Sequence, residues 1–294
     1  MSASSNCTIS CESGSSGMRF PALHSLRRVR LHARYSGRRT DAPFVERLTT
    51  GDLERLNKLL PWRCFTVDRK GRPFGGIAWR GKRVTPESIP DRRIELFHER
   101  FHLSDKHVLE IGCFEGIHTI ALCRLADRVT AVDARVENVV KTVVRCAFFD
   151  ERPRVVVHDI ENEAGDGEFL HADVCHHVGV LYHLTDPVTH LRRLGKWISC
   201  GLMLDTHYAR DEDATQEYEV SGERFCFRPY VERGRGDVFS GMRPTSKWLR
   251  LDDIERVLRG VGFDMIEIVE TREERNGPRV LLFAESSSSS EGAI

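Results

Sequence analysis

The chain of 294 residues has no apolar run close to the ~20 residues that a membrane-spanning helix needs, so no membrane partner is expected. It also has no net charge, because Lys+Arg and Asp+Glu both number 44, and overall charge gives no indication of nucleic-acid binding. None of the nine cysteines belongs to a C-x-x-C pair, which argues against a disulfide framework and favours a reducing, cytoplasmic location. The remaining composition, 40% hydrophobic and 30% charged, is that of a soluble globular protein.

Acidic residues are missing from 18–40, where seven arginines stand, and the seventeen residues before it are mostly Ser, Gly and Cys. A segment rich in Ser and Arg and poor in acids is typical of an organelle transit peptide. The alternative, which we favour for residues 1–40, is a disordered tail. Its positive charge suits contact with phosphates, which leaves an RNA substrate open. At the other end, the serine run 286–290 indicates a second disordered tail over 287–294.

From residue 107 onward, short apolar runs alternate with amphipathic ones, which is the pattern of a sheet built from βαβ units. Strands are expected at 107–113, 128–133, 154–159, 172–181, 201–207, 265–270 and 279–285. Helices are expected at 116–126, 135–148, 187–198 and 251–260. Asp186 followed by Pro187 is a good start for the third of them. In the second, apolar residues recur at helical spacing at Val136, Val139, Val140, Val143, Val144 and Ala147.

The expected fold class is α/β, with a Rossmann-like, seven-stranded mixed sheet and helices on both of its faces. This domain spans 107–286 and carries an irregular insertion at 208–250 that would form a lid. A helical and loop segment over 41–106 precedes it.

The turn after the first expected strand lacks the G-x-G-x-x-G pattern with which a dinucleotide fold cradles a pyrophosphate. It reads VLEIGCFEG over 108–116, so Gly112 and Gly116 allow a ligand to approach closely, while Phe114 replaces a glycine. Glu115 would stand at a helix N-terminus, where it would repel a pyrophosphate. S-adenosylmethionine has no phosphate and carries a cationic amino group and sulfonium, so Glu110 and Glu115 suit it better.

Acidic residues also follow the next two expected strands. Asp133 ends the second strand, 17 residues after Gly116, where a carboxylate can accept hydrogen bonds from both ribose hydroxyls. Asp159 ends the third strand, where it could accept from an adenine amino group while Ile160 packs on the ring. Together, in order and at strand ends, these residues predict one nucleoside-binding site.

With these motifs, residues 105–286 resemble the class I methyltransferases, which use S-adenosylmethionine. VLEIGCFEG and AVDAR (131–135) carry the resemblance. It implies that Glu110, Gly112, Cys113 and Gly116 lie near the methionyl part of the cofactor, Asp133 at the ribose and Asp159 at the adenine. The expected cofactor site is completed by Trp79, Ala134, Ile160 and Val178.

A narrower resemblance, over about 59–200, is to the bacterial tRNA wobble-uridine carboxymethyltransferases. LLPWR (59–63), AWRGKR (78–83) and GVLYHLTDPVTHL (179–191) are similar to segments of that family, whose members transfer a carboxymethyl group from a carboxylated S-adenosylmethionine. In that family a lysine follows LLPWR and meets the additional carboxylate, whereas Cys64 stands there in this chain. Loss of this charge-assisted bond predicts ordinary S-adenosylmethionine as the cofactor.

Candidate catalytic residues follow the fourth and fifth expected strands. They are Tyr182 and His183 after one strand, and His207 and Tyr208 after the other. A base among them would serve an oxygen or nitrogen acceptor, whereas a thioether needs none. In the lid, aromatic and cationic residues are mixed with acids, which fits a small polar acceptor, zwitterionic or anionic. The candidate substrate-binding residues there are Tyr230, Arg243 and Trp248.

A zinc-protease pattern, H-E-x-x-H, occurs as HERFH at 98–102, but no third ligand is evident nearby and we expect no metal. The expected function is in-line methyl transfer from S-adenosylmethionine to an oxygen, nitrogen or sulfur atom of a small-molecule acceptor. A tRNA-modifying (carboxy)methyltransferase is the first alternative, favoured by GVLYH and the arginine-rich arm. An inactive binding protein that keeps the cofactor fold is the second.

Overall fold

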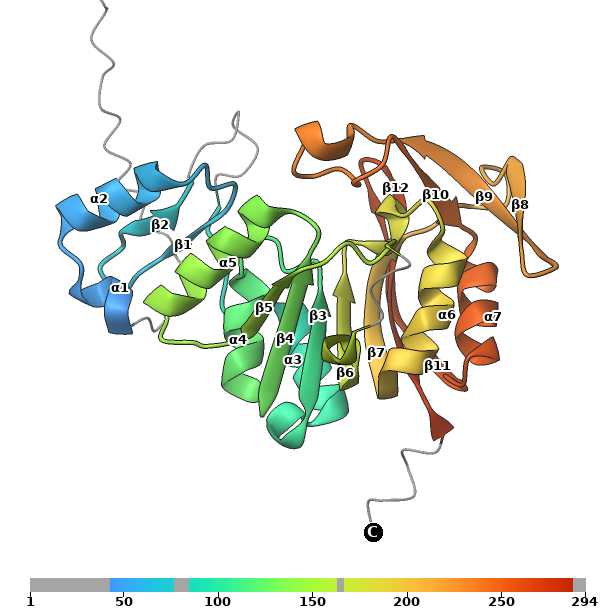
Figure 1. Ribbon diagram of the computed structural model, residues 1–294, viewed down its shortest axis with the longest axis horizontal. Helices are drawn as coiled ribbons and strands as arrows, with labels where there is room; N and C mark the ends of the chain where they lie inside the picture. The colour runs from blue at the N-terminus through green and yellow to red at the C-terminus, as the bar shows by residue number, and fades with distance from the viewer. Residues whose placement is uncertain (1–42, 77–84, 163–166, 288–294) are drawn as a thin grey trace, which may run out of the picture. The chain divides into compact units, whose positions relative to one another are not determined.

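The computed structural model describes residues 43–76, 85–162 and 167–287. Seven strands form its main sheet in the order β11-β12-β7-β6-β3-β4-β5 (Figure 1). Five of them run parallel: β3 (His107–Ile111), β4 (Arg128–Asp133), β5 (Arg154–Val157), β6 (Ala172–Val178) and β7 (Ile198–His207). β12 (Gly277–Glu285) pairs antiparallel with both β7 and β11 (Met265–Glu274). The predicted fold class, a Rossmann-like mixed sheet, is confirmed.

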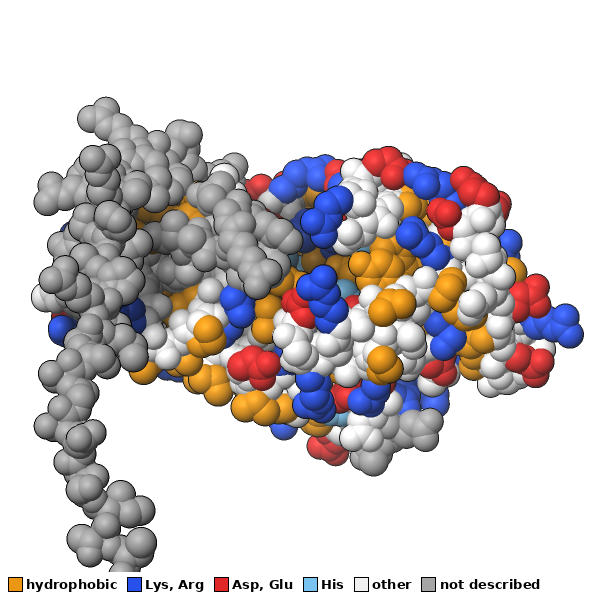
Figure 2. Space-filling model, turned by 90° about the horizontal axis from the view of Figure 1, so that it is seen from above, with side chains coloured by type: hydrophobic (Ala, Val, Ile, Leu, Met, Phe, Trp, Pro, Cys, Tyr) orange, Lys and Arg blue, Asp and Glu red, His pale blue; other side chains and the backbone are white. Residues whose placement is uncertain are grey.

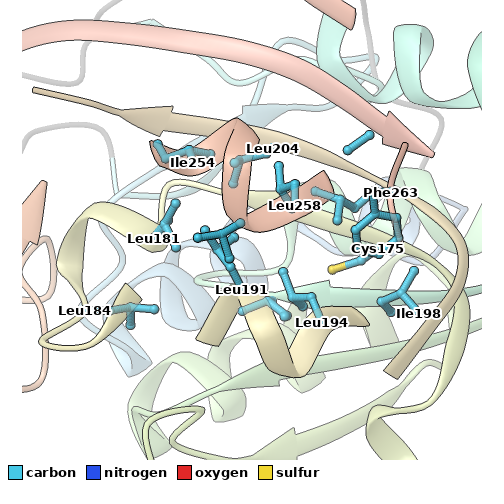
Figure 3. Close-up of a cluster of buried hydrophobic side chains, with 14 of the residues drawn as sticks. Cys175, Leu181, Leu184, Leu191, Leu194, Ile198, Leu204, Ile254, Leu258 and Phe263 are labelled. Atoms are coloured by element: carbon cyan, nitrogen blue, oxygen red, sulfur yellow. The ribbon is translucent and has the colours of Figure 1, made fainter. Parts of the chain in front are cut away.

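Helices cover both faces of this sheet, as predicted. α3 (Arg92–Phe101), α4 (Ile117–Leu125) and α5 (Val136–Phe148) share a buried cluster with Val108 and Val174 of the sheet. The next residue along each of those strands belongs to a second cluster, which therefore lies on the opposite face. α6 (Pro187–Trp197) and α7 (Leu251–Gly260) cover that face. Figure 3 shows the second cluster, where apolar side chains from helices and sheet meet: Cys175, Leu191, Leu194, Leu204, Ile254, Leu258 and Phe263.

Two details of the helices bear on the expectations. α6 begins at Pro187, and Asp186 caps it by accepting a hydrogen bond from the Thr189 amide at 3.1 Å, as the sequence predicted. Within the described ranges, no helix combines the length and the apolar character that crossing a bilayer requires.

The segment before the main sheet contains more regular structure than the helices and loop that were predicted. α1 (Pro43–Arg47) and α2 (Thr50–Leu59) are followed by a hairpin of β1 (Phe65–Val67) and β2 (Pro73–Gly75). Strands of three residues are too short to show a period-2 pattern, which is why the sequence did not reveal them. The hairpin belongs to the core, since Trp62 and Phe74 are buried with their ring centroids 5.4 Å apart.

The insertion at 208–250 is a three-stranded antiparallel sheet, so the prediction of irregular structure was wrong. Its strands β8 (Gln216–Val220), β9 (Glu223–Val231) and β10 (Thr245–Leu249) pair in the order β10-β9-β8. Ser221 and Gly222 join β8 to β9 with positive φ angles of 54° and 82°, as in a two-residue hairpin turn. The sequence held the signal, because buried Phe225 and Phe227 alternate with more exposed residues along β9.

The α5 helix turns three of its five valines toward solvent, although helical spacing of apolar residues is the usual mark of a core-facing stripe. Val136, Val140 and Val143 are 59%, 41% and 49% exposed. The buried face of the helix is largely polar instead and includes Asn138, Lys141, Thr142 and Arg145. Because buried polar groups need partners, this inversion indicates a hydrogen-bonded network beneath α5.

A buried histidine pair is expected to make the stability of the fold depend on pH. The Nε2 atoms of His177, on β6, and His190, on α6, lie 2.9 Å apart in the core. Burial lowers the pKa of His177 to about 4 and also lowers the pKa of His190. Below pH 6.5 the unfolded chain therefore binds more protons than the folded chain. From His177 alone, the free energy of unfolding should fall by about 3 kcal/mol between pH 6.5 and 4, and His190 should add to this loss.

Urea unfolding at a series of pH values measures this effect. The double variant His177→Leu, His190→Leu removes both imidazoles and fills the site with apolar side chains, so the difference between its profile and that of the wild type isolates the pair. Parallel profiles between pH 6.5 and 4 would contradict the prediction.

Candidate cofactor and acceptor site

A cavity of about 720 Å³ lies at the carboxyl ends of β3, β4, β5 and β6 and extends beneath the lid. Ligands of open α/β sheets bind at this edge, outside the strands. The cavity is lined by most of the predicted site residues: Glu110, Gly112, Cys113, Asp133, Ala134, Asp159, Ile160, Val178, Tyr182, His183, His207, Tyr230 and Trp248. Gly116, Tyr208 and Arg243 are not among the lining residues, and Trp79 lies outside the described residues.

The loop after β3 owes its path to three residues with positive φ: Gly112 (81°), Phe114 (49°) and Gly116 (80°). A Cβ atom at Gly112 would come within 2.4 Å of the Val180 Cγ2 atom, so only glycine fits there. Phe114 adopts the left-handed conformation itself, and its ring lies 5.5 Å from that of Phe239 in the lid. The departure from a middle glycine therefore leaves the turn intact.

Glu110 is buried at the floor of the cavity. Its Oε2 atom accepts a hydrogen bond from the Thr119 hydroxyl at 2.5 Å, and no ion pair among the described residues includes it. Burial raises the pKa of this carboxyl to about 7. A cationic group beside Glu110 would supply the missing countercharge, so the ammonium of S-adenosylmethionine fits this position.

Glu115 does not play the part that the sequence suggested. Its carboxylate is fully buried and accepts hydrogen bonds from the backbone amides of Arg63 and Cys64 at 2.8–3.1 Å. Two cations of α5 neutralise it, with Lys141 Nζ at 2.8 Å and Arg145 Nη2 at 3.5 Å. The Glu115 carboxylate thus joins the segment before β1 to the loop after β3. Because Lys141 and Arg145 already neutralise it, it is not available to a cationic ligand.

Asp133 is held rigidly at the end of β4. Its carboxylate accepts hydrogen bonds from the amides of Phe114 (3.1 Å) and Arg135 (2.9 Å) and from the side chain of Asn138. Burial nevertheless raises its pKa. The Asp133 carboxylate therefore holds the loop after β3 through Phe114 and also borders the cavity.

Asp159 and Ile160 border the cavity after β5, where Asp159 forms an ion pair with Arg243 at 3.2 Å. Arg243 was predicted to bind substrate from the lid. It lies instead at the acid expected to meet the adenine, and it ties the lid to that end of the cavity.

The lid is fastened to the cofactor side by Arg135, which the sequence analysis missed. This side chain is 5% exposed and donates four hydrogen bonds of 2.9 Å to backbone carbonyls of the lid. The acceptors are the carbonyls of Gly234, Arg235, Asp237 and Ser240. Because it follows Asp133 by two residues, Arg135 couples the position of the lid to the expected ribose end of the site.

At the other end of the cavity, aromatic rings are stacked. Trp248 lies parallel to His207 (centroids 4.7 Å apart) and to Tyr230 (4.8 Å), and Tyr182 meets His207 edge-on at 4.8 Å. β6 ends at Val178, three residues earlier than predicted, because Gly179 turns the chain with φ 75°. The short helix Leu181–His183 then presents Tyr182 and His183 to the cavity.

His183 is oriented by Glu232, a second lid residue that the sequence analysis missed. Its Nδ1 atom lies 2.8 Å from the Glu232 Oε1 atom. Glu232 also accepts from the Ser240 and Ser246 hydroxyls and the Gly241 amide. Burial raises the pKa of Glu232. The hydrogen bond from His183, the positive charge of His183 when protonated and the hydrogen bond from Ser240 outweigh burial and hold this pKa at about 2. An ionised Glu232 places the ring proton on Nδ1, which leaves the Nε2 lone pair as the basic atom.

Comparison with solved structures gives the class of the fold. The N-terminal domain of EvdMO1 with SAH bound matches with a TM-score of 0.62 at 22% identity, over 80% of this chain and 96% of that chain. The same domain in the presence of SAH and D-fucose matches with a TM-score of 0.60, also at 22% identity and over the same shares of the two chains. The chain shares its Rossmann-like fold with this SAH-bound domain, and the resemblance noted in the sequence is confirmed at the level of the fold.

Two curated relatives are similar to this chain in sequence. The tRNA U34 carboxymethyltransferase of Shewanella loihica is 26% identical over 239 residues, which are 77% of this chain and 66% of that protein. The enzyme of the same name from Saccharophagus degradans is 24% identical over 176 residues, 57% of this chain and 50% of that protein. The chain thus spans about half to two-thirds of the length of these relatives. No protein-family model matches it.

Proposed function

We propose that this chain is an S-adenosylmethionine-dependent methyltransferase with a small polar molecule as acceptor. The observation that carries the proposal is the buried Glu110 carboxylate, which lacks an ion-pair partner among the described residues and borders a loop that only glycine at 112 allows. Asp133 and Asp159 border the same cavity at the expected ribose and adenine positions. The SAH-bound EvdMO1 domain, which shares the fold, supports the choice of cofactor.

The charge of the cavity supports a cationic ligand and a small acceptor. Among the described residues that line it, nine are acidic and five are arginines. The acids are Glu87, Glu110, Glu115, Asp133, Asp159, Glu161, Glu232, Asp237 and Glu274, and the arginines are Arg93, Arg135, Arg233, Arg275 and Arg279. Glu115 is neutralised by Lys141 and Arg145, and Asp159 pairs with Arg243, so seven acids remain against five arginines. This negative excess favours a sulfonium over a polyanion.

The residues of the acceptor end suit a nucleophile that must lose a proton. Bound S-adenosylmethionine supplies a methyl carbon that its sulfonium already activates. The protein then has to orient the acceptor in line with that carbon and remove its proton. Tyr182, Tyr230 and Trp248 would position the acceptor, and His183, held by Glu232, would take the proton on Nε2. An O- or N-nucleophile is therefore favoured over a thioether.

Calorimetric titration of the purified chain with S-adenosylmethionine and with S-adenosylhomocysteine tests the cofactor. A screen of small alcohols, phenols and amines that follows release of S-adenosylhomocysteine then tests the activity. Absence of binding to both compounds would refute the proposal. Tight binding without turnover of any acceptor would favour the inactive binding protein.

Replacing Asp133 by alanine should weaken cofactor binding by about 1.5–3 kcal/mol, the range for a hydrogen bond to a charged group. The variant would lose the proposed ribose contact and the hydrogen bonds to Phe114 and Asn138 that order the loop. Calorimetry measures the affinity, and Asp237→Ala, at another acid that borders the cavity, is the control. Wild-type affinity in Asp133→Ala would remove Asp133 from the ribose site.

A second candidate is modification of tRNA with a carboxylated cofactor, because the curated relatives are tRNA U34 carboxymethyltransferases. Over the described part of the face in Figure 2, however, basic and acidic side chains are interspersed and form no continuous basic surface. At the position after LLPWR, the Cys64 thiol lies 3.1 Å from the Glu115 carboxylate, and burial raises its pKa, so it offers no cation.

We therefore expect ordinary S-adenosylmethionine to bind at least as tightly as the carboxylated form. Burying a further carboxylate is costly unless a cation pairs with it. Arg93 and Arg279 border the cavity, but both are already paired with Asp205. A competition titration measures the preference. A tenfold preference for the carboxylated cofactor would overturn this expectation and make tRNA the leading acceptor.

A further inference from the structure

Three residues, Glu110, His118 and His176, meet at the floor of the cavity, on the face of the sheet covered by α3 and α4. Glu110 on β3 and His176 on β6 are register partners in the parallel pair, so their side chains stand next to each other on one face. His118, in the first turn of α4, faces His176 with the ring centroids 5.0 Å apart. One donor atom from each of the three residues lies within 4.8 Å of the others.

His176 has no hydrogen-bond partner on either ring nitrogen, although the side chain is only 1% exposed. A buried polar group without a partner costs free energy, and a histidine that served only for packing would be replaced at no loss by an apolar residue. Phe97 already packs against the ring, at 5.7 Å between centroids. Both ring nitrogens of His176 are therefore available to bind a ligand.

The other two residues are oriented by neighbours in the way that metal ligands usually are. Asp91 lies 2.9 Å from His118 Nε2, and Arg93 donates to the same Asp91 oxygen at 2.6 Å. Arg93 Nη2 also lies 3.1 Å from His118 Nε2. Because an ionised Asp91 can only accept, the shorter contact of 2.9 Å assigns the proton of His118 to Nε2 and leaves the Nδ1 lone pair free. Glu110 in turn accepts from Thr119. Carboxylate–histidine pairs and hydrogen-bonded carboxylates of this kind fix the first-shell ligands of metal sites.

We propose that Glu110, His118 and His176 form a binding site for a divalent transition metal such as Zn²⁺. Two imidazoles and one carboxylate are a donor set that Zn²⁺ accepts, with a fourth position left for water or a ligand. Because Glu110 and His118 border the cavity, that position would open toward it. Donor atoms on one Zn²⁺ stand about 3.3 Å apart, so small side-chain shifts would close the cluster. Arg93, which contacts His118, is neutralised by Asp91 and Asp205.

A metal at this site would compete with the cofactor, because both would use the Glu110 carboxylate. This consequence rests on the proposed function, whereas metal binding itself does not. By linkage, each ligand should weaken the other by the same factor.

The test is a titration of the metal-free full-length chain with Co²⁺, whose visible absorption reports nitrogen and oxygen ligands, followed by displacement with Zn²⁺. We expect one equivalent to bind, and His176→Phe and His118→Gln each to weaken it by about 100-fold. His190→Gln is the matched control, because it removes a buried histidine on the opposite face and should leave Co²⁺ binding unchanged. Circular dichroism of each variant verifies that it is folded.

Failure of the wild type to bind Co²⁺ would overturn the metal site, as would equal binding by the wild type and folded His176→Phe. In a second arm, Zn²⁺ should weaken S-adenosylmethionine binding to the wild type but not to His176→Phe. If S-adenosylmethionine does not bind at all, the proposed function fails, while the Co²⁺ titration still decides the metal site.

Discussion

Glu115→Ala is expected to lower the free energy of unfolding by about 3–5 kcal/mol, the cost of breaking a buried ion pair from one side. The substitution would leave the ammonium of Lys141 and the guanidinium of Arg145 buried without a counter-ion, since their side chains are 1% and 0% exposed. It would also remove the acceptor for the backbone amides of Arg63 and Cys64. Urea unfolding monitored by circular dichroism measures the loss.

Glu223→Ala is the matched control for this prediction. Glu223 also pairs with two cations, Arg192 and Arg256, but its side chain is 52% exposed and water replaces the lost partners. We expect its loss to cost about 0–1 kcal/mol. Adding Lys141→Met to Glu115→Ala should recover part of the stability, because it removes one of the stranded charges. Equal effects of Glu115→Ala and Glu223→Ala would show that the network beneath α5 is not a source of stability.

The sequence predicted the sheet, and it predicted residues that border one cavity, because both depend on short-range patterns. Each parallel strand contains a short apolar run, and Gly112, Asp133 and Asp159 lie at or just after the carboxyl ends of strands that must meet in this topology. The loop path could not be predicted at Phe114, since a phenylalanine with φ 49° is uncommon and needs support from tertiary contacts.

The parts that sequence patterns missed depend on partners that are distant in the chain. The charged and polar residues of α5 face inward because Lys141 meets Glu115, 26 positions away, and this pairing overrides the valine stripe. Arg135 holds carbonyls that lie 99–105 positions further along. Glu232 is 49 positions from His183. No local periodicity records such pairs, so only the three-dimensional arrangement identifies the network beneath α5, the fastening of the lid and the oriented histidine.

The second large effect is expected on the turnover number, at His183. His183→Ala should lower kcat by about 10²–10⁴-fold with a hydroxyl-bearing acceptor, the usual contribution of a general base. Glu232→Gln should cost less, about 10- to 100-fold, because Glu232 acts through the orientation of His183 and does not take the proton itself. KM for the acceptor and the affinity for S-adenosylmethionine should change little in both variants, since His183 lies at the aromatic end of the cavity, beside Tyr182.

Two readouts separate a base from a residue that only shapes the cavity. The deficit of His183→Ala should shrink as the pH is raised, because the acceptor then loses its proton without help, and it should nearly vanish with a thiolate acceptor, which needs no base. His171→Ala, at an exposed histidine outside the cavity, is the control and should keep wild-type rates. A deficit in His183→Ala that is the same at every pH and for every nucleophile would assign His183 to positioning, and the base would then have to be sought at His207 or Tyr182.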